Sequence, residues 1–224
     1  MRRRTPLVIG CAALFVLASS PSLLFGSIEE QRARLPPAAE QDAGADCSDP
    51  ATGVWLGQQY NQRSRTWQRY RLDIRRRAPG AAELVGTVRV HFWAGWYSHS
   101  TPVTACEGAG QLAAEVTQNA TGRADGVSLA FGGNDWRTTQ VFCQPPGTAV
   151  SYNPDRFTGS IDPSIQEFQS VNNDGGSAVN EPVVFRRIEC ASAPRPVVVI
   201  QSPAAPPPPM PWGRGRSSRF GCSR

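Results

Sequence analysis

Apolar and polar residues alternate along much of the chain between residues 47 and 190. In Tyr70–Ile74 the even positions are apolar and the odd positions are charged, and Leu84–Phe92 repeats the alternation. The turn sequence Ala78-Pro79-Gly80 separates the two runs, so this region is predicted to form a long β-hairpin. Further short alternating runs lie at 127–131 and 157–161, a turn cluster lies at 172–176, and the strand-like run at 183–188 closes the domain. Many short strands with frequent turns predict an all-β domain, either an antiparallel barrel or a sandwich.

The remaining segments differ from this pattern. Residues 27–46 are polar and acidic and are predicted to be a linker, with a short helix at Ser27–Leu35. Residues 191–224 are rich in Pro and Arg and are predicted to be a disordered tail, because they hold too little apolar surface to fold alone. Within the domain, only Glu107–Asn119 has a helix-like period, and the pattern leaves helix or strand open there.

The first 26 residues have the features of an export signal. Arg2, Arg3 and Arg4 precede an uncharged stretch at residues 5–28. A basic start followed by an apolar segment indicates a secretory signal, although the stretch is also long enough to be an uncleaved anchor in the inner membrane. Ala18-Ser19-Ser20 offers small residues for cleavage, but Pro21 follows them. Either alternative predicts a periplasmic or extracellular domain.

The charge is unevenly distributed, and this excludes one class of function. Residues 47–190 carry 13 Arg and 13 acidic residues, whereas residues 191–224 carry five Arg and no acids. A neutral domain lacks the basic footprint of a nucleic-acid-binding protein, so nucleic acid is not an expected partner. The basic tail is the segment expected to contact an anionic surface.

Export changes how the cysteines are interpreted, because an oxidising compartment favours disulfides. Four cysteines belong to the domain, and four allow three connectivities. Cys47 and Cys190 lie at its two borders, and a closed sheet brings its first and last strands together, so we expect them to pair. Cys106 and Cys143 would then join two strands. Cys222, in the tail, has no assigned partner.

Two positions resemble the lipocalins and related barrels. Gly53-Val54-Trp55 at the start of the first strand resembles the family's G-x-W motif, and small secreted bacterial β domains open similarly. The resemblance implies an Arg on the last strand that packs across the Trp and closes one end of the barrel. Arg187 fits this role, because it shares the parity of Val183 and Phe185. The chain shows no second lipocalin motif.

The densest aromatic stretch is His91–His99, which holds four aromatic residues and both histidines. Trp93 has the outward parity of its strand, and Trp96 and Tyr97 are expected in a following turn. We therefore predict that Trp93, Trp96 and Tyr97 bind a ligand or partner, since large aromatics give extensive contact at low entropy cost. The alternative is that these rings pack into the core.

Catalytic and metal-binding patterns are weak. The two histidines lack a third ligand for a metal, and no nucleophile motif accompanies them. Asp135, Asp155 and Glu167 could pair for acid–base chemistry, but their positions favour solvated acids. We therefore expect a non-catalytic domain without a cofactor that binds a small or extended ligand. The alternatives are a structural or interaction module of the cell envelope and, least expected, a hydrolytic enzyme.

Three features of a structure would separate these functions. A deep apolar cavity would favour ligand binding inside the barrel. A filled core with an exposed aromatic patch would favour an interaction module. A buried acid with a shifted pKa beside a polar cleft would favour an enzyme.

Overall fold

The computed structural model describes residues 27–39, 45–107, 111–176 and 178–192; the predicted signal segment and nearly all of the basic tail lie outside these ranges. In chain order the elements are α1 (Ile28–Arg34), β1 (Ala45–Asp46), β2 (Gly53–Asn61), β3 (Thr66–Arg76), β4 (Glu83–Ala94), β5 (Ala113–Asp125), β6 (Ser128–Gly133), β7 (Arg137–Cys143), β8 (Arg156–Asp162), β9 (Glu167–Asn173), β10 (Val179–Glu189) and β11 (Ala191–Ser192). No helix within the described ranges is long and apolar enough to cross a membrane.

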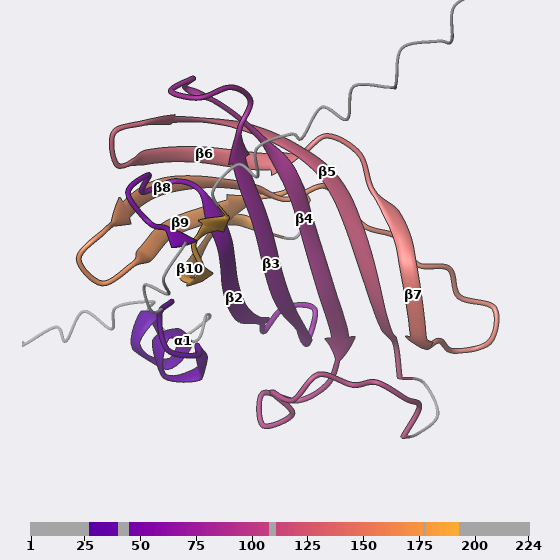
Figure 1. The fold of residues 1–224 in the computed structure, drawn as a ribbon. Helices are drawn as coiled ribbons and strands as arrows, with labels where there is room; N and C mark the ends of the chain where they lie inside the picture. The colour runs from indigo at the N-terminus through magenta and orange to yellow at the C-terminus, as the bar shows by residue number, and fades with distance from the viewer. Residues whose placement is uncertain (1–26, 40–44, 108–110, 177, 193–224) are drawn as a thin grey trace, which may run out of the picture. The chain divides into compact units, whose positions relative to one another are not determined.

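Eight of the described strands, all except β1, β7 and β11, form a closed antiparallel barrel (Figure 1). Each barrel strand pairs with the next one along the chain, and β10 pairs back with β2 to close the circle. At this closure Phe185 lies opposite Gly57 and Arg187 lies opposite Trp55. The all-β antiparallel fold predicted from the alternation is confirmed, and the architecture is the barrel rather than the sandwich.

Strand β5 has two partners along one edge. Its second half, Ala120–Asp125, pairs with β6, and its first half, Ala113–Thr117, pairs with β7. The barrel continues from β6 to β8, so β7 lies outside the closed circle (Figure 1). The segment that returns from β7 to β8 carries Tyr152, whose ring stacks on that of Phe92 inside the barrel.

The inward and outward positions follow the alternation seen in the sequence. In β3 the side chains of Tyr70, Leu72 and Ile74 are fully buried in the barrel core, while the charged residues between them face outward. Strand side chains alternate between the two faces of a sheet, and burying one face of each strand accounts for this pattern.

In the segment where the pattern left helix or strand open, Ala113–Asn119 form the start of β5. Ala114, Val116 and Gln118 alternate as inward-facing, buried side chains. Alanine and glutamate are good helix formers, but pairing with β4 on one side and β7 on the other overrides that local preference.

The predicted helix is present, but residues 27–39 are not a free linker. Ser27 and Glu30 form a reciprocal capping box at the start of α1. The side chain of Gln31 is buried against the barrel, where its Nε2 donates to the carbonyl of Pro182 and its Oε1 accepts from the amide of Val184. These two backbone groups lie beyond the last pair between β10 and β2, so α1 satisfies them where the two strands diverge.

Both expected disulfides are present, with Cα–Cα separations of 5.0 Å for Cys47–Cys190 and 4.9 Å for Cys106–Cys143. The first joins the two borders of the barrel, beside the short pair β1–β11. The second ties the segment after β4 to the end of β7. Disulfides of this kind fit an oxidising, exported environment.

Candidate functional site

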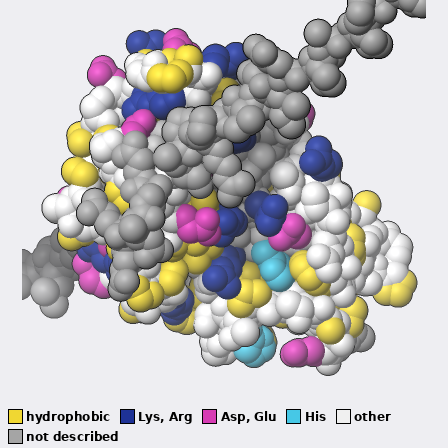
Figure 2. Space-filling view, in the orientation of Figure 1, with side chains coloured by type: hydrophobic (Ala, Val, Ile, Leu, Met, Phe, Trp, Pro, Cys, Tyr) yellow, Lys and Arg dark blue, Asp and Glu magenta, His cyan; other side chains and the backbone are white. Residues whose placement is uncertain are grey.

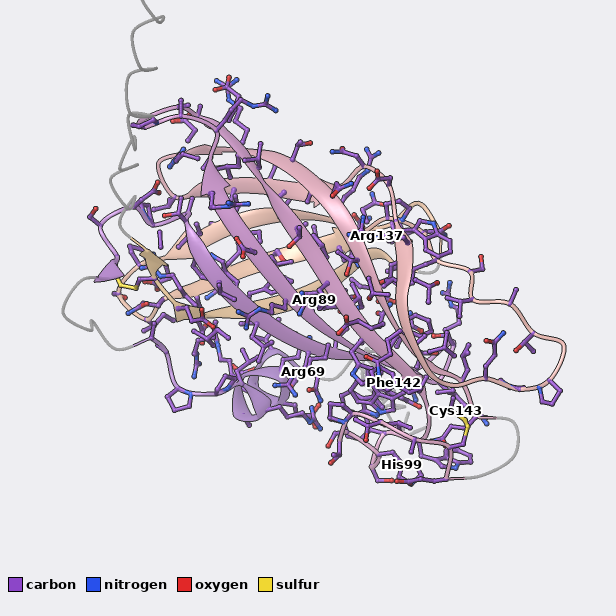
Figure 3. The ribbon with its side chains drawn as sticks, turned by 45° about the vertical axis from the view of Figure 1, so that its right-hand side comes forward. Arg69, Arg89, His99, Arg137, Phe142 and Cys143 are labelled. Atoms are coloured by element: carbon purple, nitrogen blue, oxygen red, sulfur yellow. A yellow bond between two sulfur atoms is a disulfide. The ribbon has the colours of Figure 1, made fainter. Side chains whose placement is uncertain are left out.

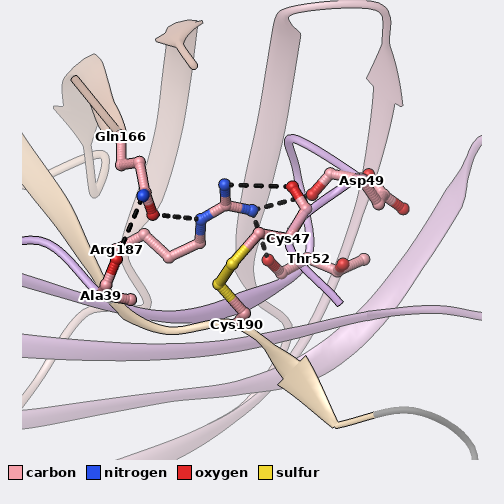
Figure 4. The surroundings of a disulfide bond; sticks show 7 residues. All are labelled: Ala39, Cys47, Asp49, Thr52, Gln166, Arg187 and Cys190. Carbon is pink, nitrogen blue, oxygen red and sulfur yellow. Dashed lines mark hydrogen bonds between the residues drawn. A yellow bond between two sulfur atoms is a disulfide. The ribbon is translucent and has the colours of Figure 1, made fainter. Parts of the chain in front are cut away.

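One end of the barrel is closed by Arg187 and Trp55. Figure 4 shows Arg187 with its hydrogen-bond partners beside the Cys47–Cys190 disulfide. The guanidinium carbon of Arg187 lies 5.4 Å from the centre of the Trp55 ring, and both side chains are buried. The guanidinium donates to the carbonyls of Cys47, Asp49 and Thr52 and to the side-chain oxygen of Gln166. This is the arrangement that the G-x-W resemblance implies, and it leaves only the other end of the barrel for a ligand.

Aromatic rings fill the middle of the barrel. Tyr70, Phe157 and Phe185 lie edge to face or tilted at centroid distances of 4.9–5.9 Å, and Phe168 stacks on Phe185 at 5.7 Å. All four side chains are almost completely buried. The core therefore matches a filled barrel and not the deep apolar cavity expected of a binder of hydrophobic ligands.

Beyond this aromatic layer, the inward positions become polar at the open end, which we call the mouth. Asp155 is buried there, with an exposed fraction of 1%. Its Oδ2 accepts hydrogen bonds from Gln118 Nε2 at 2.6 Å and from the hydroxyl of Tyr152 at 2.8 Å, and its Oδ1 accepts from Asn172 Nδ2 at 2.7 Å. Three donors from three different parts of the chain thus converge on one carboxylate.

A second buried carboxylate, Glu181, belongs to the same polar layer. Its Oε1 accepts from Asn61 Nδ2 at 2.8 Å, and its Oε2 accepts from Gln59 Nε2 at 3.2 Å. The amide of Gln59 also donates to the hydroxyl of Tyr70 at 3.1 Å, and that hydroxyl lies 3.4 Å from Nδ2 of Asn172. The two acids are therefore linked through a continuous set of side-chain hydrogen bonds.

Burial changes the proton affinity of these groups. Loss of hydration raises the pKa of Asp155 to about 6, although its hydrogen bonds favour the charged form. Burial, together with the nearby charge of Asp174, raises the pKa of Glu181 to about 7. The pKa values of the Tyr70 and Tyr152 hydroxyls are raised well above their ordinary value for the same reason. Both carboxyls therefore titrate near neutral pH.

An open cleft of about 240 Å³ lies at the mouth, next to this network. Gln68 and Tyr152 belong to both the network and the cleft, because each lines the cleft and hydrogen-bonds to a buried partner. Phe92 and Leu112 supply apolar surface, and Asp174 lies at its rim. The full lining is Ser64, Thr66, Gln68, Phe92, Ala94, Leu112, Ser151, Tyr152, Asn153 and Asp174.

The three predicted ligand-binding aromatics lie on the outside of the barrel near the mouth, and they differ in exposure. Trp93 points outward but is completely buried beneath the segment after β4, where its Nε1 donates to the carbonyl of His99. Trp96 and Tyr97 are 61% and 38% exposed. Trp93 is therefore a support for this segment and offers no contact surface, because the chain folds back over it and stacks Trp67 against it.

Two arginines cover parts of the aromatic cluster on the outside of the barrel, which consists of Trp67, Trp93, Trp96 and Tyr97. Arg34 from α1 lies 4.9 Å from the Tyr97 ring and 5.1 Å from the Trp67 ring, and it donates to the Tyr97 hydroxyl. Arg65 lies 4.8 Å from the ring of Trp96. The exposed aromatic surface is thus smaller than the sequence indicates.

The interpretation of the acids as solvated is wrong for two of the three. Asp155 and Glu167 are each only 1% exposed, and Glu167 is paired with Arg32 and Arg186 beneath α1. Only Asp135 is solvent-exposed. A signal for the mouth was present in the strands, because Gln118 and Glu181 are polar residues at positions whose strand neighbours of the same parity, such as Val116 and Val183, are apolar.

No group of three or more His, Cys, Asp or Glu side chains placed to hold a metal occurs in the described part of the chain. Comparison with known proteins gave no match to a protein-family model, to a curated protein or to a solved structure.

Proposed function

We propose that this protein is an exported, non-catalytic barrel that binds a small polar ligand in the cleft at its mouth. The observation that carries the proposal is the buried layer of hydrogen-bonding side chains behind that cleft. A pocket with a few convergent polar groups and shifted pKa values is the usual form of a binding site. The filled aromatic core supports a ligand held at the mouth instead of inside the barrel.

A lipocalin-like organisation supports the same assignment. The barrel has eight strands in continuous up-and-down order, a G-x-W motif on its first strand and an Arg across that Trp on its last. Closure of one end by Trp55 and Arg187 leaves a single accessible end. We propose that the relationship to lipocalins is one of architecture, with a shallow polar site in place of a deep apolar one.

The cleft favours a ligand that combines hydrogen-bonding groups with a small apolar part. Gln68, Tyr152 and Asn153 offer donors and acceptors, while Phe92 and Leu112 offer an apolar wall. Asp174 at the rim and the two carboxyls behind it make the mouth unfavourable for an anion, because like charges repel more strongly where water is scarce. A neutral or positively charged ligand is therefore expected.

The test uses a variant that fills the cleft. Ala94 lines the cleft and is partly exposed, so Ala94→Leu should occupy part of its volume without disturbing the core. A library of small neutral and cationic compounds would be screened by ligand-observed NMR against the wild type, Ala94→Leu and the surface control Ala130→Leu. Compounds that bind the wild type and the control but not Ala94→Leu support the proposal. If every compound that binds the wild type also binds Ala94→Leu equally well, the cleft is not the site.

A hydrolytic enzyme is the second candidate, because a buried acid with a raised pKa beside a polar cleft is also what acid–base catalysis needs. Three donors already engage both oxygens of Asp155, which supports a role in holding Tyr152 over one in proton transfer. Incubating each compound that binds with the protein and analysing it for products decides between the two. Turnover that is lost in Asp155→Asn but kept in Asp125→Asn would favour the enzyme.

A further inference from the structure

The outward face of β3 and β4 carries a compact group of arginines away from the mouth cleft. Arg71 on β3 lies directly opposite Arg89 on β4, and Arg69 lies opposite His91. These positions share the outward parity of their strands, since Tyr70, Leu72 and Val90 face the core. Figure 2 shows several Arg side chains gathered near the centre of this view beside a His, and Figure 3 labels Arg69 and Arg89 on the outer wall.

This arrangement is electrostatically unfavourable by itself. Like charges placed directly opposite one another in an antiparallel pair destabilise it, and diagonal neighbours remain within reach of long side chains. The group therefore brings three guanidinium groups together on a domain that is neutral as a whole. A bound anion would remove the repulsion.

Most of the hydrogen-bond donors in this group are unused by the described residues. Arg71 pairs with Glu189 through one nitrogen, Nη2, at 3.0 Å. Arg89 approaches Glu115 at 3.6 Å, which is beyond hydrogen-bond length. The side chain of Arg69 makes no ion pair or hydrogen bond within the described ranges. Each guanidinium offers five N–H donors, so many remain available.

The arginines line a groove of about 270 Å³ built on rigid parts of the fold. Its floor includes Leu56 of β2, and Pro102 forms part of one wall. Pro102 belongs to the segment that the Cys106–Cys143 disulfide ties to β7, and His91 beside the groove is held by a hydrogen bond to the carbonyl of Val103 at 2.9 Å. The groove is therefore a concave surface lined by three arginines, with one carboxylate, Glu115, in its lining.

We propose that this groove binds a phosphate group, held between Arg69, Arg71 and Arg89. Planar guanidinium groups match the oxygens of a phosphate in pairs, and such charge-assisted hydrogen bonds are stronger than neutral ones. The volume suits one phosphate group with a small substituent. Glu115 lines the groove beside Arg89, and Glu189 pairs with Arg71, so we expect a doubly charged anion, which can compete with these carboxylates for the arginines.

Titration of the full-length protein with inorganic phosphate at low ionic strength tests the proposal, with the side-chain N–H signals of arginine followed by NMR. The double variant Arg69→Gln/Arg89→Gln should bind phosphate at least about tenfold more weakly, as expected for loss of charge-assisted hydrogen bonds. The matched control Arg77→Gln/Arg123→Gln removes two exposed arginines outside the groove, one just after β3 and one near the end of β5, and should change the affinity less than twofold. Phosphate should also raise the melting temperature of the wild type and not that of the double variant.

Absence of saturable phosphate binding would overturn the proposal. Equal weakening in the two double variants would also overturn it and would assign the binding to the basic segments outside the domain. Given binding at the groove, vesicles identify the source of the phosphate group. If vesicles of phosphatidylcholine with phosphatidylglycerol bind the wild type and bind the Arg69/Arg89 variant less, the ligand is a lipid headgroup. Vesicle binding that is equal in the two proteins, with phosphate binding lost in the variant, identifies a soluble phosphate ester.

Discussion

At the residue scale, two buried charged groups dominate the two ends of the barrel, and they are stabilised in different ways. Arg187 is surrounded by carbonyl oxygens and one aromatic ring, so its charge is compensated by dipoles and a ring face. Asp155 is surrounded by amide and hydroxyl donors. The first environment seals the barrel, and the second makes the mouth sensitive to pH.

Replacing Arg187 with Ala should lower the free energy of unfolding by about 1–3 kcal/mol, because it leaves buried carbonyls without donors and removes packing from Trp55. Arg123→Ala, at an exposed position, should change it by less than about 0.5 kcal/mol. Urea denaturation of both variants measures the difference. Equal stability of the two variants would show that Arg187 does not hold this end of the barrel together.

The raised pKa of Asp155 links protonation to stability. In the folded protein the pKa of this carboxyl is about 6, and the ordinary pKa of an aspartate side chain is 3.8. Between pH 3.8 and about pH 6 the folded state therefore binds more protons than the unfolded state. The free energy of unfolding falls as the pH rises through this range, by about 3 kcal/mol for this group. Glu181 acts in the same direction up to about pH 7, whereas Asp49, whose pKa is lowered by its hydrogen bond with Arg76, acts in the opposite direction at lower pH.

Because several groups contribute, the informative quantity is a difference between proteins. The unfolding free energy would be measured from pH 4 to pH 7.5 for the wild type, Asp155→Asn and the exposed control Asp125→Asn. The wild type and the control should lose stability relative to Asp155→Asn as the pH rises. Parallel curves for all three proteins would mean that Asp155 does not carry the linkage.

At the scale of elements, the strands could be predicted from the sequence because burial on one face imposes a period of two. The hairpin of β3 and β4 and the short strands β6 and β8 follow from that rule. A short helix was predicted at Ser27–Leu35, within a linker, but its docking on the barrel was not, because docking depends on Gln31 meeting backbone groups of Pro182 and Val184 that are distant in the sequence. The mouth site was missed for a similar reason, since Asp155 precedes β8 and becomes buried only when Gln118, Tyr152 and Asn172 surround it.

The Cys106–Cys143 disulfide holds the segment after β4 over the buried rings of Trp67 and Trp93. Replacing both cysteines with Ser should lower stability by about 3–4 kcal/mol in the chain-entropy model for a loop of this length. Because the segment also covers two indoles, quenching of tryptophan fluorescence by acrylamide should increase in the folded variant. Unchanged quenching would show that the aromatic contacts hold the segment without the disulfide.

At the scale of the whole molecule, the fold is a circle of strands whose first and last members meet. Each strand of the circle pairs with its neighbour in sequence, so only the contact between β2 and β10 joins distant parts of the chain. Closing that contact fixes the register of the barrel and brings together Trp55 and Arg187. The Cys47–Cys190 disulfide reinforces the same contact, with a sequence separation of 143 residues.

Removal of this disulfide by Cys47→Ser/Cys190→Ser should therefore have the larger effect of the two, about 4–5 kcal/mol in the same entropy model. Urea denaturation of the two double variants side by side measures the ranking. A smaller loss for Cys47/Cys190 than for Cys106/Cys143 would show that the β2–β10 contact already restricts the unfolded chain, or that the model does not apply here.

The Cys47–Cys190 disulfide also determines how the molecule carries mechanical load. A pulling force applied to the chain before Cys47 and after Cys190 passes directly through the covalent bond between them, and the barrel strands enclosed by it bear no tension. The helix α1 and the short pair β1–β11 lie outside that loop, so their contacts, including the pair of Arg32 with Glu167, are the first to be loaded. A pulling force on both ends would therefore separate α1 and the β1–β11 pair and leave the barrel folded.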